Sequence, residues 1–382
     1  MANGMHGGSV MRFRLFGVEI NVHASWVLVA LLIAWSLASG AFPVIYKGLP
    51  ASGYWLMALI AVVGLAVSIV LHELAHTLVG RAFGMSVDRI TLFLFGGVAE
   101  LHEEPKAPRA ELLMALAGPA LSVVLGFVFA LIAGLLQAAG AARELAGALA
   151  YLATLNWVLA GFNMIPAFPM DGGRVMRAIV WMATGKAERA TRISASIGMG
   201  FALILMIGGA ALALFGGVAS GLWWILIGLF LRTAAQSSLS DIDARHELAG
   251  HPVSDVMVRQ VETAPANMTL DAFVQERLYA SHHGMYPVVD GDRLVGVIEA
   301  TDLLKTPRDA WARTTLGEVC RPLDETPQAR LAEDAFAVFE RMRQTGAVRM
   351  LVVDRGDLVG LVTVHDIAQR LAMAAKYAPK AA

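Results

Sequence analysis

Charged residues are scarce in this chain of 382 residues: they make up 16%, while hydrophobic residues make up 57%. A soluble globular protein carries about 25% charged residues, so we do not expect a wholly soluble protein. The formal net charge is only −1, and without a basic excess we exclude nucleic acid as the main partner. Cys320 is the single cysteine, so the chain can form neither an intramolecular disulfide nor a cysteine-rich zinc site.

The sequence contains long runs of apolar residues. Six of them are long enough to cross a bilayer, which takes about 20 helical residues. They fall near residues 22–40, 54–83, 110–139, 147–170, 192–215 and 218–236. Lysine and arginine gather in one set of connecting segments, whereas the opposite set holds only Lys47 and Arg143. Cytoplasmic loops carry the basic excess, so we predict that both termini are cytoplasmic. No clear small-residue cleavage site follows the first run, so we predict that it is a retained anchor.

The second run contains the segment His72-Glu73-Leu74-Ala75-His76. On a helix, residues four apart share one face, so His72 and His76 can bind one zinc ion with Glu73 as general base. A chance match is the alternative. Ionisable side chains in a membrane helix are costly unless they face a partner or a cavity, so the setting favours a functional site. Such a site still needs a third ligand.

The fourth run ends at a segment that supplies a candidate for that ligand. Pro166 and Pro169 stop a regular helix, and Asp171 follows them directly. Asp171 could be the missing oxygen ligand, with the fourth metal position left for water. It could also be an interfacial residue where a helix ends before a turn at Gly172-Gly173. Spacing alone does not decide between these interpretations.

A further segment, between the second and third runs, is not helical in character. Ile90–Phe95 is rich in β-branched and aromatic residues, and Gly96-Gly97 follows it, which is typical of a strand and a turn. Non-helical backbone at membrane depth requires protein or a water-filled cavity around it. An ordinary cytoplasmic loop is the alternative.

Taken together, His72–His76 and Asn163–Gly173 resemble the site-2 protease family of intramembrane zinc metalloproteases. The signature of that family pairs H-E-x-x-H with N-x-x-P-x-x-P-[LM]-D-G, and both motifs stand here in the same order on separate predicted spans. The resemblance covers roughly residues 22–174. It implies an enzyme that cleaves membrane-anchored proteins within or near the bilayer.

The resemblance also implies the roles of individual residues. His72, His76 and Asp171 would be the ligands of one Zn²⁺ per chain, and Glu73 would be the catalytic base. Asn163 would hold the substrate backbone or an oxyanion near the metal.

Two further segments are similar to features of the same family. Ala117-Gly118-Pro119 in the third run is similar to a motif that lets helices pack closely. Met85–Leu101 looks like a membrane-inserted β-hairpin that receives substrate as an added strand. The family often has Asn where this chain has Ser122, so a contact from that position is not carried over.

After Ser240 the composition becomes soluble and charged, and an internal repeat begins. Tyr286–Ile298 matches Met350–Val362 closely. Each unit is predicted to run strand, helix, strand, turn, strand, helix. The duplicated unit resembles a tandem pair of CBS domains, with repeats at about 250–307 and 313–373.

Many CBS pairs bind adenine nucleotides through a Ser or Thr and an Asp three residues later. The second repeat keeps this arrangement as Thr363 and Asp366, whereas the first has Asp302 preceded by Glu299 at the hydroxyl position. A carboxylate facing phosphate is unfavourable, so we expect one adenine nucleotide at most. A purely structural dimerisation module is the alternative.

The sequence thus predicts a polytopic α-helical membrane protein with about six transmembrane helices and a membrane-associated β-hairpin, followed by a soluble α/β tandem CBS pair. Residues 1–240 would form the intramembrane zinc protease domain and residues 241–382 a cytoplasmic CBS domain pair. The expected location is the plasma membrane of a bacterial or archaeal cell. The expected partners are the lipid bilayer, a second copy bound through the CBS pair, and a single-span substrate such as an anti-sigma factor or signalling precursor. A nucleotide-gated transporter or channel and a catalytically silent client-binding protein are the alternatives.

Overall fold

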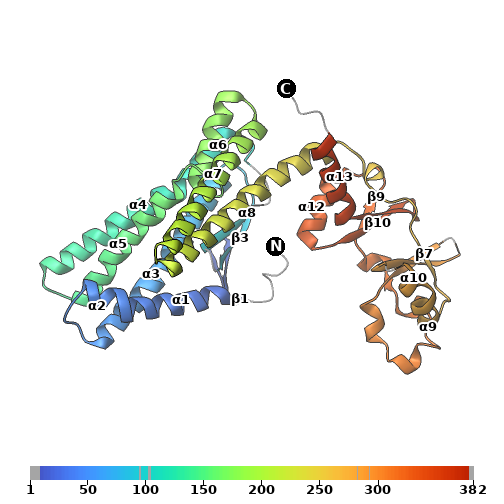
Figure 1. Ribbon diagram of the computed structural model, residues 1–382, viewed down its shortest axis with the longest axis horizontal. Helices are drawn as coiled ribbons and strands as arrows, with labels where there is room; N and C mark the ends of the chain where they lie inside the picture. Colours follow the sequence, from blue (N-terminus) through green and yellow to red (C-terminus); the bar gives the residue numbers. More distant parts are fainter. Residues whose placement is uncertain (1–8, 94–95, 102–104, 282, 292, 378–382) are drawn as a thin grey trace. The chain divides into compact units, whose positions relative to one another are not determined.

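The computed structural model describes residues 9–93, 96–101, 105–281, 283–291 and 293–377. The described residues divide into two compact units, one formed by residues 9–240 and the other by residues 241–377 (Figure 1).

Six helices in the described part of the chain are long and apolar enough to cross a membrane, as predicted. Five are single helices, α3 (Ala51–Ala82), α4 (Pro108–Ala138), α5 (Arg143–Asn163), α7 (Ala187–Leu214) and α8 (Val218–Leu248). The first span, Ala24–Ile45, comprises α1 (Ala24–Ser36), a π-helical turn (Leu37–Ala41) and α2 (Phe42–Ile45). Large apolar side chains remain exposed along these helices, among them Leu31, Phe127 and Ile204. A lipid environment accounts for such exposure, which a soluble protein would avoid.

The fourth span is shorter than predicted. It ends at Asn163, not at residue 170, and a separate helix, α6 (Asp171–Thr184), begins after seven intervening residues. Pro166 and Pro169 lie in the connecting segment, where each lacks the N–H group that would continue the helix. Asp171 therefore opens a helix and is not an interfacial residue at the end of one. Gly172 and Gly173, which we considered as a turn, are helical.

Close packing holds the segment 164–170 against α6. A Cβ atom added at Gly173 would lie 2.6 Å from the backbone carbon of Ala167 and equally close to the amide nitrogen of Phe168. Ala167 and Met170 are buried together with Ala202 of α7 and Leu231 of α8. This packing determines where α6 begins and therefore where Asp171 lies.

The predicted hairpin is present, as β3 (Val87–Phe93) and β4 (Gly96–Leu101), and it belongs to a larger sheet. Gly96 and Gly97, which we predicted as its turn, are instead paired residues of β4, and predicted strand residues 94 and 95 lie outside the described residues. The sheet has the order β1-β2-β3-β4, in which β1 (Ser9–Leu15) and β2 (Val18–His23) form a second hairpin. β2 pairs with β3 in parallel, with Ile20 opposite Ile90. We did not predict the N-terminal strands. The alternation of Arg12 and Arg14 with apolar neighbours was the signal for them.

One face of this sheet packs on the apolar part of α3. The buried cluster between them contains Val18, Ile20, Trp26, Val70, Leu74, Ile90 and Leu92. Because Val70 and Leu74 come from the turns of α3 on either side of His72, the sheet and the histidines belong to one packed region of the unit.

The C-terminal unit contains both predicted repeats. The second repeat follows the predicted order: β9 (Gln328–Arg330), α12 (Ala335–Thr345), β10 (Arg349–Asp354), β11 (Asp357–Thr363) and α13 (Val364–Tyr377). The first repeat has β5 (Ala264–Pro265), a helical stretch of α9 (Leu270–Phe273), a π-helical turn (Val274–Leu278) and α10 (Tyr279–Ser281), then β6 (Met285–Asp290) and β7 (Arg293–Glu299). It ends in a short 3₁₀ turn, Asp302–Lys305, where we predicted a helix. After this turn come a second 3₁₀ turn (Arg308–Ala310), α11 (Leu316–Val319) and β8 (Arg321–Pro322).

An apolar cluster joins the two repeats. Met285, Leu294 and Val297 of the first repeat are buried with Leu351 of the second. The last turns of α8 also belong to this unit, because Ala244 and Leu248 are buried in the core of the second repeat. The sixth span was predicted to end at residue 236, but α8 continues without a break to Leu248.

Candidate metal centre and active site

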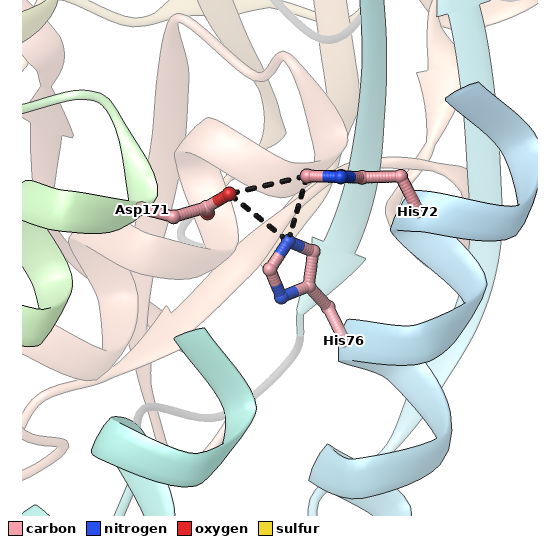
Figure 2. A group of neighbouring side chains, drawn as sticks. All are labelled: His72, His76 and Asp171. Carbon is pink, nitrogen blue, oxygen red and sulfur yellow. Dashed lines mark hydrogen bonds and ion pairs between the residues drawn. The ribbon is translucent and has the colours of Figure 1, made fainter. Parts of the chain in front are cut away.

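His72 and His76 lie one turn apart on α3, on the same face of the helix, as their spacing predicts (Figure 2). Their Nε2 atoms are 3.1 Å apart. His72 is only 3% exposed. Two imidazole nitrogens that meet in a protein interior need a third group to compensate for their burial.

Asp171 supplies that group. Its Oδ2 atom lies 3.1 Å from His72 Nε2 and 3.2 Å from His76 Nε2. Burial by itself raises the pKa of Asp171, but the interactions with His72 and His76 outweigh burial and hold the pKa well below its usual range. In Figure 2 the carboxylate points from the start of α6 directly at the two rings.

The other ring nitrogens determine which tautomers are present. His76 Nδ1 lies 2.6 Å from the carbonyl oxygen of Met114. A carbonyl can only accept, so Nδ1 carries the proton and donates, and Nε2 keeps its lone pair for the site. His72 Nδ1 lies 2.9 Å from Ser122 Oγ, and this hydrogen bond holds the orientation of the second ring.

Sequence reasoning missed both of these partners. Met114 acts through its backbone, which carries no residue-specific signal. Ser122 is fully buried in α4, and a lone hydroxyl in an apolar span near the A-G-P motif was the available signal.

Gly118 allows α4 to approach the histidines. A Cβ atom added there would overlap His76 Nε2 and would lie 2.7 Å from His72 Nε2. Ala117-Gly118-Pro119 was expected to let helices pack closely. At Gly118, the groups that pack closely against α4 are the imidazole rings of the site.

The three donors fit a zinc ion. Ligands held at about 2.0–2.1 Å in a tetrahedron lie roughly 3.3 Å from one another, close to the 3.1–3.2 Å between these atoms. The described residues contain one cluster of three potential metal-binding side chains, and it consists of His72, His76 and Asp171. Two imidazoles and one carboxylate, with a fourth position open, form the donor set of a catalytic zinc site.

A cavity of about 340 Å³ opens next to this cluster. Glu73 lines it, and a Cβ atom added at Gly97 of β4 would lie 2.7 Å from Glu73 Cγ. Asn163 also lines it, with Nδ2 at 3.5 Å from His72 Nε2. The structure thus brings all five residues that we predicted for this site to the wall of one cavity.

Two polar residues of the cavity wall were not predicted as site residues. Thr77 follows His76 on α3, and its hydroxyl is buried without a hydrogen-bond partner among the described residues. Arg174 lies one turn after Asp171 on α6. Arg174 was not predicted as a site residue, because the start of α6 was not recognised from the sequence.

In the C-terminal unit, Thr363 and Asp366 are bonded to each other. The Thr363 hydroxyl donates to Asp366 Oδ2 at 2.6 Å, and the amide of Asp366 donates to Thr363 Oγ1 at 3.1 Å. Both residues are partly exposed, Thr363 at the end of β11 and Asp366 in the first turn of α13. The predicted pair therefore has its hydroxyl and carboxylate side by side and within reach of solvent.

In the first repeat, the equivalent carboxylate, that of Asp302, is buried and bonded to other protein groups. Asp302 is 3% exposed and accepts hydrogen bonds from the Glu299 amide at 3.0 Å and from Lys305 at 2.8 Å. Arg321 donates to Asp302 at 3.2 Å and pairs with the Glu299 carboxylate at 2.7 Å. Burial by itself raises the pKa of Asp302, but these donors and the charge of Arg321 outweigh it, so the pKa is lowered. The Asp302 carboxylate is thus already occupied by protein donors.

Comparison with known families matches both units. Residues 60–148 and 132–207 match peptidase family M50. Residues 253–309 and 327–373 match the CBS domain.

Similar proteins cover almost the whole chain. Rip3 of Mycobacterium tuberculosis is 36% identical over 358 residues, covering 93% of this chain and 91% of that protein. The protein sll0528 of Synechocystis is 30% identical over 368 residues, covering 95% and 94%. Their names assign both provisionally to the zinc metalloproteases. Among solved structures, a site-2 protease from Methanocaldococcus jannaschii is 31% identical, covers 60% of this chain and 94% of its own, and has a TM-score of 0.40.

Proposed function

Because the chain belongs to peptidase family M50 and is an intramembrane zinc metalloprotease of the site-2 type, we propose that His72, His76 and Asp171 hold its zinc ion. The observation that carries this proposal is the convergence of three donor atoms, each 3.1–3.2 Å from the other two, from α3 and α6. Because the family consists of proteases, its membership favours a protease over the two alternatives, a transporter or channel and a catalytically silent client-binding protein.

The chemistry then divides among a few side chains. A bound zinc ion supplies a Lewis acid that lowers the pKa of a water ligand from 15.7 to about 7 and polarises a carbonyl group. Glu73 takes a proton from the attacking water and delivers it to the leaving amine as the C–N bond breaks. The Asn163 amide donates a hydrogen bond to the carbonyl oxygen as it gains negative charge.

The substrate is a membrane-anchored protein, and we propose that its cleaved segment adds to β4 as a further strand. In the described sheet, β4 is an edge strand and pairs only with β3. The approach of Gly97 to Glu73 brings this edge close to the proposed base. A substrate helix must unwind to expose its carbonyl groups, and strand addition offers its backbone new partners. Helix-breaking residues in a single-span substrate, such as an anti-sigma factor or signalling precursor, should therefore favour cleavage.

We also propose that an adenine nucleotide regulates cleavage through Thr363 and Asp366 in the second repeat. Support comes from α8, whose Leu231 lines the active-site cavity. The same helix, without interruption, carries Leu248 in the core of the second repeat. A ligand that prefers one arrangement of the repeats can thus act on the cavity wall, with a coupling of about 1–3 kcal/mol in typical allosteric systems.

The proposed setting is the plasma membrane of a bacterium or archaeon, with both termini cytoplasmic and with dimers formed through the CBS pair. A reporter fused after Arg245 should then give a cytoplasmic signal, and one near Lys47 an external signal. The reverse result would refute the orientation and the access of cytoplasmic nucleotides.

The central experiment compares zinc content with cleavage in the purified full-length protein. We expect about one zinc per chain in the wild type and in Glu73→Gln, and strongly reduced retention in Asp171→Ala. Glu73→Gln should lose cleavage, so uncut membrane stubs should accumulate in cells that carry it and identify the substrate by membrane proteomics. Full zinc occupancy in Asp171→Ala would show that another residue is the third ligand.

A further inference from the structure

Arg174 is the only lysine or arginine among the described residues that line the active-site cavity. It is half-buried and lies three residues after Asp171, one turn along α6. Its charge interacts with Glu73, but no described residue accepts a hydrogen bond from its guanidinium group or lies within ion-pair distance. A guanidinium group carries five N–H donors, and leaving them without partners in a partly buried site is costly.

A second arginine on the same helix provides the contrast. Arg177 pairs with Glu111 of α4 at 3.0 Å, and the Glu111 side chain is only 1% exposed. The arginine that anchors α6 to its neighbour thus has a buried carboxylate of its own. Arg174 lacks such a partner in the described part of the chain, and it lines the same cavity as the proposed zinc ligands.

The position of Arg174 matches what an extended substrate needs. Gly97 of the edge strand β4 and the metal-binding cluster line the same cavity as Arg174. A substrate strand that pairs with β4 satisfies the carbonyl groups on one edge only, because successive backbone groups point to opposite sides. The carbonyl groups of its other edge are left without donors from β4.

We propose that Arg174 binds backbone carbonyl oxygens of the extended substrate, on the edge that faces away from β4 and next to the bond that is cleaved. Carbonyl oxygens fit this cavity better than a substrate carboxylate, because Glu73 and Asp171 already contribute two carboxylates to it. Recognition of this kind is independent of the substrate's side chains. The proposal rests on the proposed metal ligands and on strand addition at β4.

Binding of two hydroxamates to the full-length, zinc-loaded protein in nanodiscs tests this role without requiring turnover. Acetohydroxamate reaches only the metal, whereas a neutral peptide hydroxamate of four residues also presents backbone carbonyl groups along the cavity. Arg174→Gln should weaken the peptide hydroxamate about 10- to 150-fold, the loss expected for hydrogen bonds to a charged group. Zinc content and acetohydroxamate affinity should stay unchanged, and Arg174→Lys should recover part of the loss.

Arg189→Gln is the matched control, because Arg189 is exposed on α7 and lies outside the cavity. It should bind both probes as the wild type does. Unchanged affinity of the peptide hydroxamate in Arg174→Gln would overturn the proposal, and so would an equal loss for both probes. A loss seen only with a probe that carries a glutamate would also overturn it, in favour of a carboxylate site. A wild type that holds zinc poorly or does not bind acetohydroxamate would instead refute the metal assignment on which the proposal rests.

Discussion

Gly118→Ala should damage the metal centre without contacting the metal. The added methyl carbon would lie 2.7 Å from His72 Nε2, where ordinary contact begins at 3.4 Å, and it would overlap His76 Nε2. The rings, or α4 itself, must therefore move by at least about 0.7 Å. Metal sites tolerate shifts of only about 0.2 Å in ligand distance.

The structure leaves the rings little room to move. The Nδ1 atom of each ring is hydrogen-bonded, in His76 to the Met114 carbonyl at 2.6 Å and in His72 to the Ser122 hydroxyl at 2.9 Å. Both partners also belong to α4, so a shift of that helix moves them as well. Loss of one such partner typically costs 10- to 100-fold in metal affinity. Displacement of both rings should thus cost on the order of 100-fold or more.

Zinc affinity, measured by competition with a chelating dye in the purified full-length protein, tests this expectation. Gly134→Ala is the matched control, since it makes the same substitution on the same helix where nothing lies within 4 Å. Alanine favours the helix over glycine equally at both positions, by about 1 kcal/mol. Cleavage should fall with zinc affinity in Gly118→Ala, while Gly134→Ala should behave as the wild type. Wild-type zinc affinity in Gly118→Ala would show that the rings are not confined as the structure indicates.

Three further predictions concern other parts of the chain. Ser122→Ala removes the hydrogen bond to His72 and should weaken zinc binding about 10- to 100-fold in the same dye assay, and an unchanged affinity would mean that another group orients the ring. Asp366→Ala should abolish binding of ATP, ADP or AMP to the full-length protein in calorimetry, with zinc content unchanged; if none of the three binds the wild type, the CBS pair is structural. Because the pKa of Asp302 is lowered, its ion pair with Arg321 stabilises the C-terminal unit above the usual pKa of about 3.9 and is lost as the pH falls through the lowered value. Arg321→Met should thus move acid unfolding, followed by circular dichroism, to higher pH, and an unchanged midpoint would contradict this assignment.

Local patterns in the sequence determined the elements and some of the site. The six spans follow from runs of apolar residues, because the bilayer thickness sets a minimum helix length. His72 and His76 share a face because the helical period places residues four apart together. The hairpin at β3 and β4 and the duplicated C-terminal unit are also local patterns of composition and repetition. The resemblance to a family then decided between the two interpretations of Asp171 and added the role of Asn163, which periodicity could not assign.

Only the tertiary structure decided which elements meet. Asp171 is 99 positions away from His72 in the chain, and it reaches the site because two prolines end α5 and the segment 164–170 packs against α6. The Met114 carbonyl completes the site as a backbone group, so no side-chain pattern could indicate it. Arg174 and Arg177 look alike in sequence, yet one lines the cavity and the other pairs with Glu111. The physical reason is that periodicity and composition govern contacts within an element, whereas contacts between elements depend on side-chain packing and on where each helix begins and ends.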